Sequence, residues 1–96
     1  MEFLIRRKDG AFVELPAGSD CSIFRPAGFA TTLIQGRGVC AVGLEESVVT
    51  FSVEMPGIQM VVEGELPAPL AVNFAESVAN RLESMTGQAL EVVRYA

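Results

Sequence analysis

The clearest pattern in this sequence is an alternation of apolar and polar residues between Val49 and Glu63. Every second residue before Pro56-Gly57 is apolar, and the alternation resumes at Ile58, which is typical of strands that bury one face. Proline fixes φ and glycine accepts positive φ, so this dipeptide favours a tight turn. We therefore expect a β-hairpin with a short loop, whose apolar pairs share one face. These pairs are Met55 with Ile58, Val53 with Met60, and Phe51 with Val62.

A second hairpin is predicted before this one. The segments 29–35 and 39–44 flank Gly36-Arg37-Gly38, whose glycines favour a turn between two strands. The segment 44–47 is then expected to form the next turn and to lead into the strand that starts at Val48.

The N-terminal part of the chain predicts a further strand pair. Segments 2–7 and 12–15 flank Lys8-Asp9-Gly10, in which Asp-Gly is a good turn signal. Residues 16–28 contain two prolines and two glycines, and we interpret them as an irregular connection.

One amphipathic helix is predicted in the second half of the chain. Apolar residues recur there at the helical spacing and fall within one sector of the helix. They are Ala71, Phe74, Ala75, Val78, Leu82 and Met85. Pro69 suits a first helical turn, whereas Asn73 with Glu76 offers a later start as a capping box. Gly87 favours the end of the helix, and segment 89–95 returns as a strand.

These elements predict one α+β domain that spans residues 1–96. Its sheet is mostly antiparallel, with about five to seven short strands joined as hairpins or a meander. One helix from the C-terminal half packs on one face of the sheet, and a final strand follows it.

The composition adds a hint about surfaces and location. Half of the residues are hydrophobic and the mean hydropathy is +0.39, which favours an oligomeric or partner-covered face in so short a chain. No apolar run has the length of a membrane span, so a membrane is not an expected partner. The charges of Arg6-Arg7-Lys8 follow a short apolar patch, the reverse of a secretory signal, and we expect a cytoplasmic protein.

The net charge of −5 is unevenly distributed. Residues 1–44 hold five basic and four acidic residues, whereas residues 45–96 hold two basic and eight acidic ones. A phosphate backbone is repelled by such a second half, so nucleic acid is not an expected partner.

The sequence offers little catalytic chemistry. It contains no histidine, which removes the commonest general base and the ordinary zinc sites. We therefore expect no enzyme activity, no metal and no cofactor. Cys21 and Cys40 are interpreted as reduced core cysteines, and a disulfide between them is left open because only the even count supports it.

Carboxylates are the remaining candidates for a functional site. The five acidic residues near the central hairpin are Glu45, Glu46, Glu54, Glu63 and Glu65. Three interpretations compete: an ordinary solvated face, an acidic patch that binds a partner, and a pair of catalytic carboxylates. The predicted hairpin places Glu54 and Glu63 away from its apolar face, which favours solvent exposure over catalysis.

Several features of residues 48–96 together resemble one class of small proteins. They are the strand at 48–55, the helix entry Pro67-Ala68-Pro69, the run Arg81-Leu82-Glu83, and Thr86-Gly87 before a closing strand. This order is similar to small immunity proteins of bacterial polymorphic or contact-dependent toxin systems. The resemblance implies a cytoplasmic protein that binds one cognate toxin tightly and blocks it. A nuclease toxin needs a basic surface for its substrate, which would suit the acidic second half.

The main alternative is an oligomeric structural or accessory domain of a bacterial or phage assembly, which would form a homo-oligomer through sheet edges or an apolar face. A small enzyme or ligand carrier that uses the carboxylates is the third hypothesis.

Overall fold

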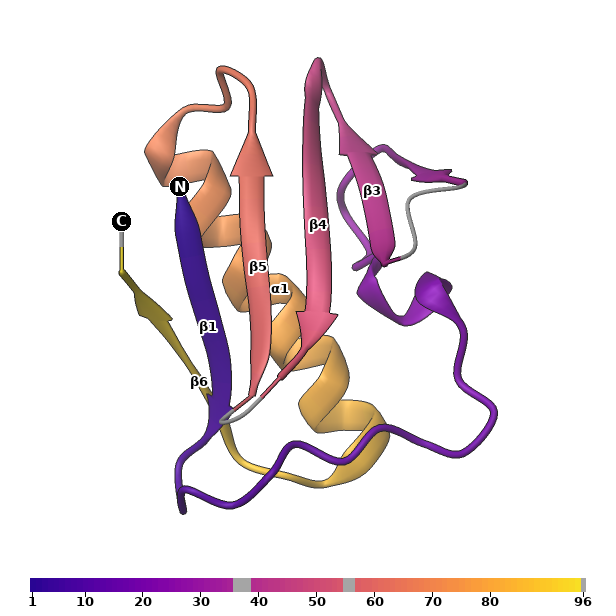
Figure 1. Cartoon of the computed structure of the whole chain (residues 1–96), viewed down its shortest axis with the longest axis vertical. Helices are drawn as coiled ribbons and strands as arrows, with labels where there is room; N and C mark the ends of the chain where they lie inside the picture. The colour runs from indigo at the N-terminus through magenta and orange to yellow at the C-terminus, as the bar shows by residue number, and fades with distance from the viewer. Residues whose placement is uncertain (36–38, 55–56, 96) are drawn as a thin grey trace.

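The computed structural model describes residues 1–35, 39–54 and 57–95. In these residues, six strands form one antiparallel sheet, and one α-helix packs against it (Figure 1). The strands are β1 (Glu2–Arg7), β2 (Thr31–Ile34), β3 (Cys40–Leu44), β4 (Ser47–Val53), β5 (Ile58–Glu63) and β6 (Leu90–Arg94). The helices are α1 (Ala68–Thr86) and a short 3₁₀ helix, η1 (Cys21–Phe24). The α+β fold with a helix on one face and a final strand is thereby confirmed.

The strand order is β2-β3-β4-β5-β1-β6, so the first strand of the chain lies inside the sheet. The prediction that segment 2–7 pairs with segment 12–15 is wrong. Residues 12–15 are described and form no strand, while β1 pairs with both β5 and β6. An interior position satisfies the backbone groups of β1 on both sides and buries Phe3 and Ile5 completely, which a local hairpin does not offer.

The central hairpin forms, but its register differs from the expected one. Val53 pairs with Ile58 and Phe51 with Met60, two residues away from the predicted partners. Gly57 lies against β1, where any side chain would collide with the carbonyl oxygen of Ile5, and its own carbonyl accepts from the Glu54 N–H at 2.7 Å. Since the side-chain period of a strand is two, the shift keeps Phe51, Ile58, Met60 and Val62 on the buried face. Val53, expected there too, is 59% exposed at the end of β4. Residues 55–56, including Met55, lie outside the described part of the chain.

The other hairpin is confirmed in part. β2 pairs antiparallel with β3, as the segments 29–35 and 39–44 predict. The predicted turn at Gly36-Arg37-Gly38 lies outside the described residues.

Helix α1 begins after Pro67, with Pro69 in its first turn. Asn73 lies inside the helix, so the later start as a capping box is wrong. The helix ends at Gly87, whose φ of 73° is left-handed and whose N–H donates to the Glu83 carbonyl at 2.8 Å. Met85, expected on the apolar side, is 41% exposed. Within the described residues, no helix is long and apolar enough to cross a membrane.

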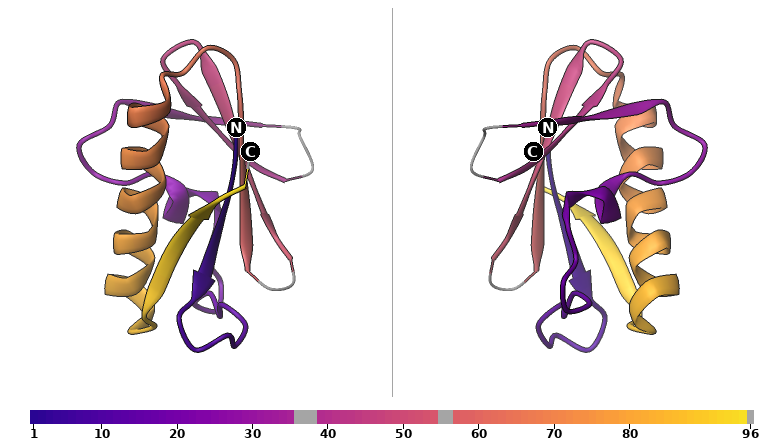
Figure 2. Two further views of the ribbon diagram at one scale, coloured as in Figure 1. Left: turned by 90° about the vertical axis from the view of Figure 1, so that its left-hand side faces the viewer. Right: turned by 90° about the vertical axis from the view of Figure 1, so that its right-hand side faces the viewer.

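Four phenylalanines connect the parts of the core. Phe51 of β4 stacks on Phe24 of η1, with ring centroids 4.4 Å apart, and lies 6.5 Å from Phe74 of α1. Phe29 meets Phe74 edge-on at 5.1 Å. Figure 2 shows α1 and η1 on the same side of the sheet, and this aromatic cluster fills the space between them.

A disulfide joins Cys21 to Cys40 and corrects the expectation of two reduced thiols. The Asp20 side chain caps η1 by accepting from the Ser22 N–H, while Phe24 stacks on Phe51. Because Phe51 pairs with Cys40 in the sheet, this packing places Cys21 beside β3, with 5.3 Å between the cysteine Cα atoms.

Replacing both cysteines with serine is expected to lower the free energy of unfolding by about 3 kcal/mol, because the bond closes a loop across a sequence separation of 19. Urea denaturation with and without a reductant measures this loss. The double variant serves as the control, since its transition should not respond to the reductant. Equal midpoints for both proteins, or two titratable thiols in the native protein, would contradict the prediction.

Candidate functional site

The face of the sheet opposite α1 is not covered by any element of the described chain (Figure 2). The strand registers place a row of apolar residues on this outer face. They are Leu4, Ile34, Ala41, Val48, Val61 and Val93. Leu4 and Ala41 are 4% and 1% exposed and lie outside the main core cluster, and the other four residues are half-buried. We call these six residues the apolar strip.

Polar side chains border the apolar strip and are held by hydrogen bonds. The Gln59 amide donates to Glu2 at 3.0 Å across two strands, and Arg6 pairs with Glu91 at 2.7 Å. An apolar centre with a polar, solvent-exposed rim is the usual composition of a protein–protein interface.

Four of the five predicted carboxylates meet at one end of the sheet. Glu45 and Glu46 form the turn between β3 and β4, Glu63 ends β5 opposite Val48, and Glu65 follows it. Glu45, Glu46 and Glu65 line one hollow of about 390 Å³, together with Ser47, Leu66 and Pro67. All four carboxylates are exposed, and we call this group the acidic end.

Glu54 does not join the acidic end. It follows β4 at the opposite end of the strand, where it accepts a hydrogen bond from the Ser52 hydroxyl at 3.4 Å. The predicted set is therefore divided by the length of β4, with four members at one end and Glu54 at the other.

Gly64 brings the two parts of the acidic end together. Its φ of 113° is available to glycine alone among common residues, and a Cβ there would lie 2.8 Å from the Ser47 Oγ. Ser47 is itself 4% exposed beneath this contact. Glu45 also has a positive φ, 54°, at the first position of the two-residue loop between Leu44 and Ser47, where glycine is commoner.

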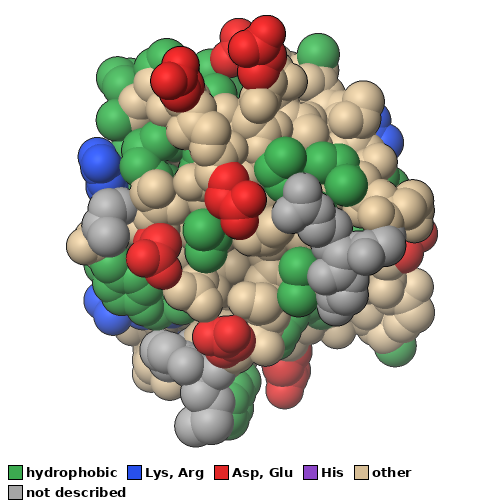
Figure 3. Space-filling model, turned by 45° about the horizontal axis from the view of Figure 1, so that its top comes forward, with side chains coloured by type: hydrophobic (Ala, Val, Ile, Leu, Met, Phe, Trp, Pro, Cys, Tyr) green, Lys and Arg blue, Asp and Glu red, His purple; other side chains and the backbone are tan. Residues whose placement is uncertain are grey.

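The acidic end is not neutralised within the described part of the chain. The ion pairs of the described residues lie elsewhere and join Arg6 to Glu91 and Arg7 to Asp9. In Figure 3, acidic side chains spread over the top and the outer face, hydrophobic ones lie between them, and basic ones are confined to the margins. This arrangement favours contact with a surface that is basic around an apolar centre.

Two carboxyl groups outside the acidic end are held in their charged form. The Arg7 side chain holds the pKa of Asp9 below its usual value, and the Ser22 hydroxyl does the same to the pKa of Asp20. No cluster of three or more potential metal ligands occurs in the described residues.

Compared with protein-family models, curated proteins and solved structures, the chain matches none.

The sequence interpretation missed the apolar strip, because it treated the second face of the hairpin as simply polar. The available signal was valine on that face, at Val48 and Val61, together with Val93 of the final strand. Two of them lie far apart in sequence on β4 and β6, so only the strand order shows that they share a face.

Changing Gly64→Ala is expected to destabilise the protein by roughly 2 kcal/mol, since it combines an unfavourable φ with a collision against Ser47. Gly18→Ala is the matched control, because Gly18 has a φ of 78° and a Cβ added there would meet nothing within 4 Å. Urea denaturation of both variants separates the collision from the backbone strain. Equal losses would show that the contact with Ser47 does not constrain the acidic end.

Proposed function

We propose that this chain is a small acidic protein-binding domain that inhibits a cognate basic partner, as a bacterial immunity protein inhibits its toxin. The observation that carries the proposal is the outer face of the sheet, where no element of the described chain covers the apolar strip. Its residues Ile34, Val48, Val61 and Val93 are half-buried, and carboxylates border them. Burial of apolar area supplies affinity in such a complex, and the carboxylates supply orientation and fast association.

The surface is large enough for this role. A stable interface of standard size buries about 800 Å² on each partner, roughly 15% of the 5295 Å² that this chain exposes. The outer face presents all six strands of the sheet, and the acidic end adjoins it at the start of β4. One partner can therefore contact both features at once.

Inhibition of this kind needs no chemistry from the inhibitor. A nuclease toxin binds a polyanionic substrate through a basic surface, and an acidic domain that covers this surface competes with the substrate. The carboxylates of Glu45, Glu46 and Glu65 suit that role, since none of them forms an ion pair with another described residue. The resemblance of residues 48–96 to immunity proteins adds support.

The proposal keeps the expected cytoplasmic location for the inhibitor. The Cys21–Cys40 disulfide opposes that location, because structural disulfides are rare in reducing compartments. Protein extracted from the native host under alkylating conditions tests the location. Two alkylated thiols would favour the cytoplasm, and an intact disulfide would favour an oxidising compartment.

Changing Glu46→Lys and Glu65→Lys together is expected to abolish capture of a basic partner from a native-host lysate, because it places two cations in the acidic end. The matched control is Glu14→Lys with Glu76→Lys, which changes the net charge equally at exposed positions elsewhere. Wild type and control should retain the partner at low salt and release it at high salt. Equal capture by all three proteins would exclude the acidic end from the interface.

The free edge of β6 favours a homo-oligomeric accessory domain as a second candidate. The backbone N–H of Tyr95 donates to the Glu2 carbonyl, and the backbone N–H of Lys8 donates to the Ala89 carbonyl. Hydrogen bonding alternates along an antiparallel pair, so the odd-numbered residues of β6 bond to β1. The N–H and C=O groups of Val92 and Arg94 then point away from the sheet. The Glu83 carboxylate caps the Leu90 N–H at 2.9 Å, which leaves the rest of the edge open to another strand.

Under this second candidate, the wild-type chain is expected to form a dimer at high concentration, and Val92→Pro is expected to leave a monomer. Proline removes the outward N–H but none of the bonds to β1. Val92→Ala keeps the N–H and serves as the control. Light scattering coupled to size exclusion measures the mass, and a wild-type monomer at every concentration would exclude pairing through this edge.

A further inference from the structure

A second hollow lies on the helix side of the molecule, away from the acidic end. Two arginines line it, Arg25 after η1 and Arg81 on α1. The hollow has a volume of about 280 Å³, and its other walls are Ser22, Pro26, Phe29 and Thr31. Two cations are therefore brought to one concave site in a chain whose net charge is −5.

Both guanidinium groups are oriented by hydrogen bonds to neutral acceptors. Arg81 donates its Nε to the Ile23 carbonyl at 3.1 Å. Arg25 donates its Nε to the Thr31 hydroxyl at 3.0 Å and its Nη2 to the Thr31 carbonyl at 2.7 Å. In the described part of the chain, the two Nη atoms of Arg81 and the Nη1 of Arg25 donate to no protein acceptor. The arginines are thus held in place while some of their donors stay available.

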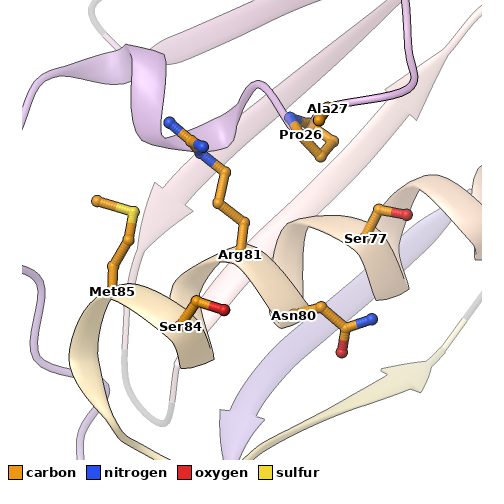
Figure 4. A pocket seen from close by; sticks show the side chains of 7 residues that line it. All are labelled: Pro26, Ala27, Ser77, Asn80, Arg81, Ser84 and Met85. Carbon is orange, nitrogen blue, oxygen red and sulfur yellow. The ribbon is translucent and has the colours of Figure 1, made fainter.

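A second, adjoining hollow of about 360 Å³ shares Arg81 and Pro26 with the first. Figure 4 shows Arg81 reaching from α1 toward η1, with Ser77, Asn80 and Ser84 on the same helix. Neither hollow has an aspartate or glutamate in its lining, although the chain contains 12 acidic residues. The ion pairs of the described residues also do not include Arg25 or Arg81.

From this geometry we infer that Arg25 and Arg81 bind the phosphate group of a small phosphorylated molecule. Two guanidinium groups match the double negative charge of a phosphate monoester, and arginine binds phosphate oxygens through paired N–H donors. The Thr31 hydroxyl, which accepts from the Arg25 Nε, borders the same hollow, whereas the Ser22 hydroxyl donates to the Asp20 carboxylate. Phe29 and Pro26 provide an apolar wall for the organic part of the ligand.

The competing explanation is that both arginines only stabilise the fold, Arg81 by holding η1 and Arg25 by covering the free edge of β2. A phosphate site predicts saturable binding at these two side chains, whereas purely structural hydrogen bonds do not.

NMR titration of the folded protein with inorganic phosphate and with phenyl phosphate tests the inference, with chloride holding the ionic strength constant. The Arg25 and Arg81 Nε–Hε signals are expected to shift together and to saturate, with a dissociation constant on the order of 1 mM for inorganic phosphate. Phenyl phosphate is expected to bind more tightly, because its ring can contact Phe29. Succinate, a dicarboxylate used for comparison, is expected to bind at least several-fold more weakly than phosphate.

Two variants locate the site without relying on loss of an arginine alone. Arg81→Gln is expected to weaken phosphate binding about tenfold. Asn80→Asp keeps both arginines and their hydrogen bonds but adds a carboxylate to the lining of the adjoining hollow, which shares Arg81 with the proposed site, and is expected to weaken binding several-fold. Asn73→Asp makes the same change two helical turns away and should have little effect.

The inference is overturned if the Nε–Hε signals do not saturate, or if Asn80→Asp and Asn73→Asp weaken binding equally. Equal affinity for succinate and phosphate would overturn the assignment to phosphate. The phosphate site is supported if the Nε–Hε signals saturate and Asn80→Asp weakens binding more than Asn73→Asp does. This result does not depend on whether the acidic end binds a protein.

Discussion

The structure depends on the burial of one face of the sheet beneath α1, with Phe51 at the centre. Phe51 stacks on Phe24 and contacts Phe74, so one side chain of β4 joins the sheet to both helices. The fully buried residues of β1, β4, β5 and α1 surround this point. Since apolar burial is the main favourable term in folding, the remaining features are arranged around this one layer.

Burial on one side leaves the other side of the sheet to solvent. The helix covers a single face, and the apolar strip lies on the uncovered one. The short turns of the β3-β4-β5 meander then place Glu45, Glu46, Glu63 and Glu65 at the same end. The proposed partner-binding surface is thus a consequence of a fold with two layers, in which no third layer of the described chain covers the outer face.

The same aromatic packing explains the other side of the molecule. Phe24 fixes η1 over β4, which places Cys21 against Cys40 and the Ile23 carbonyl within reach of Arg81. An irregular connection therefore becomes an ordered wall. That wall carries the disulfide and the hollow in which we place a phosphate group.

The features that depend on neighbours along the chain follow directly from the sequence. Side-chain alternation specifies which face of the hairpin is buried, and prolines with Gly87 bound the helix. Tertiary contacts set the partners of β1, the register between β4 and β5, the Cys21–Cys40 bond and the separation of Glu54 from the acidic end. Periodicity and turn chemistry act over a few residues, whereas these features depend on which distant segments bury the most surface together.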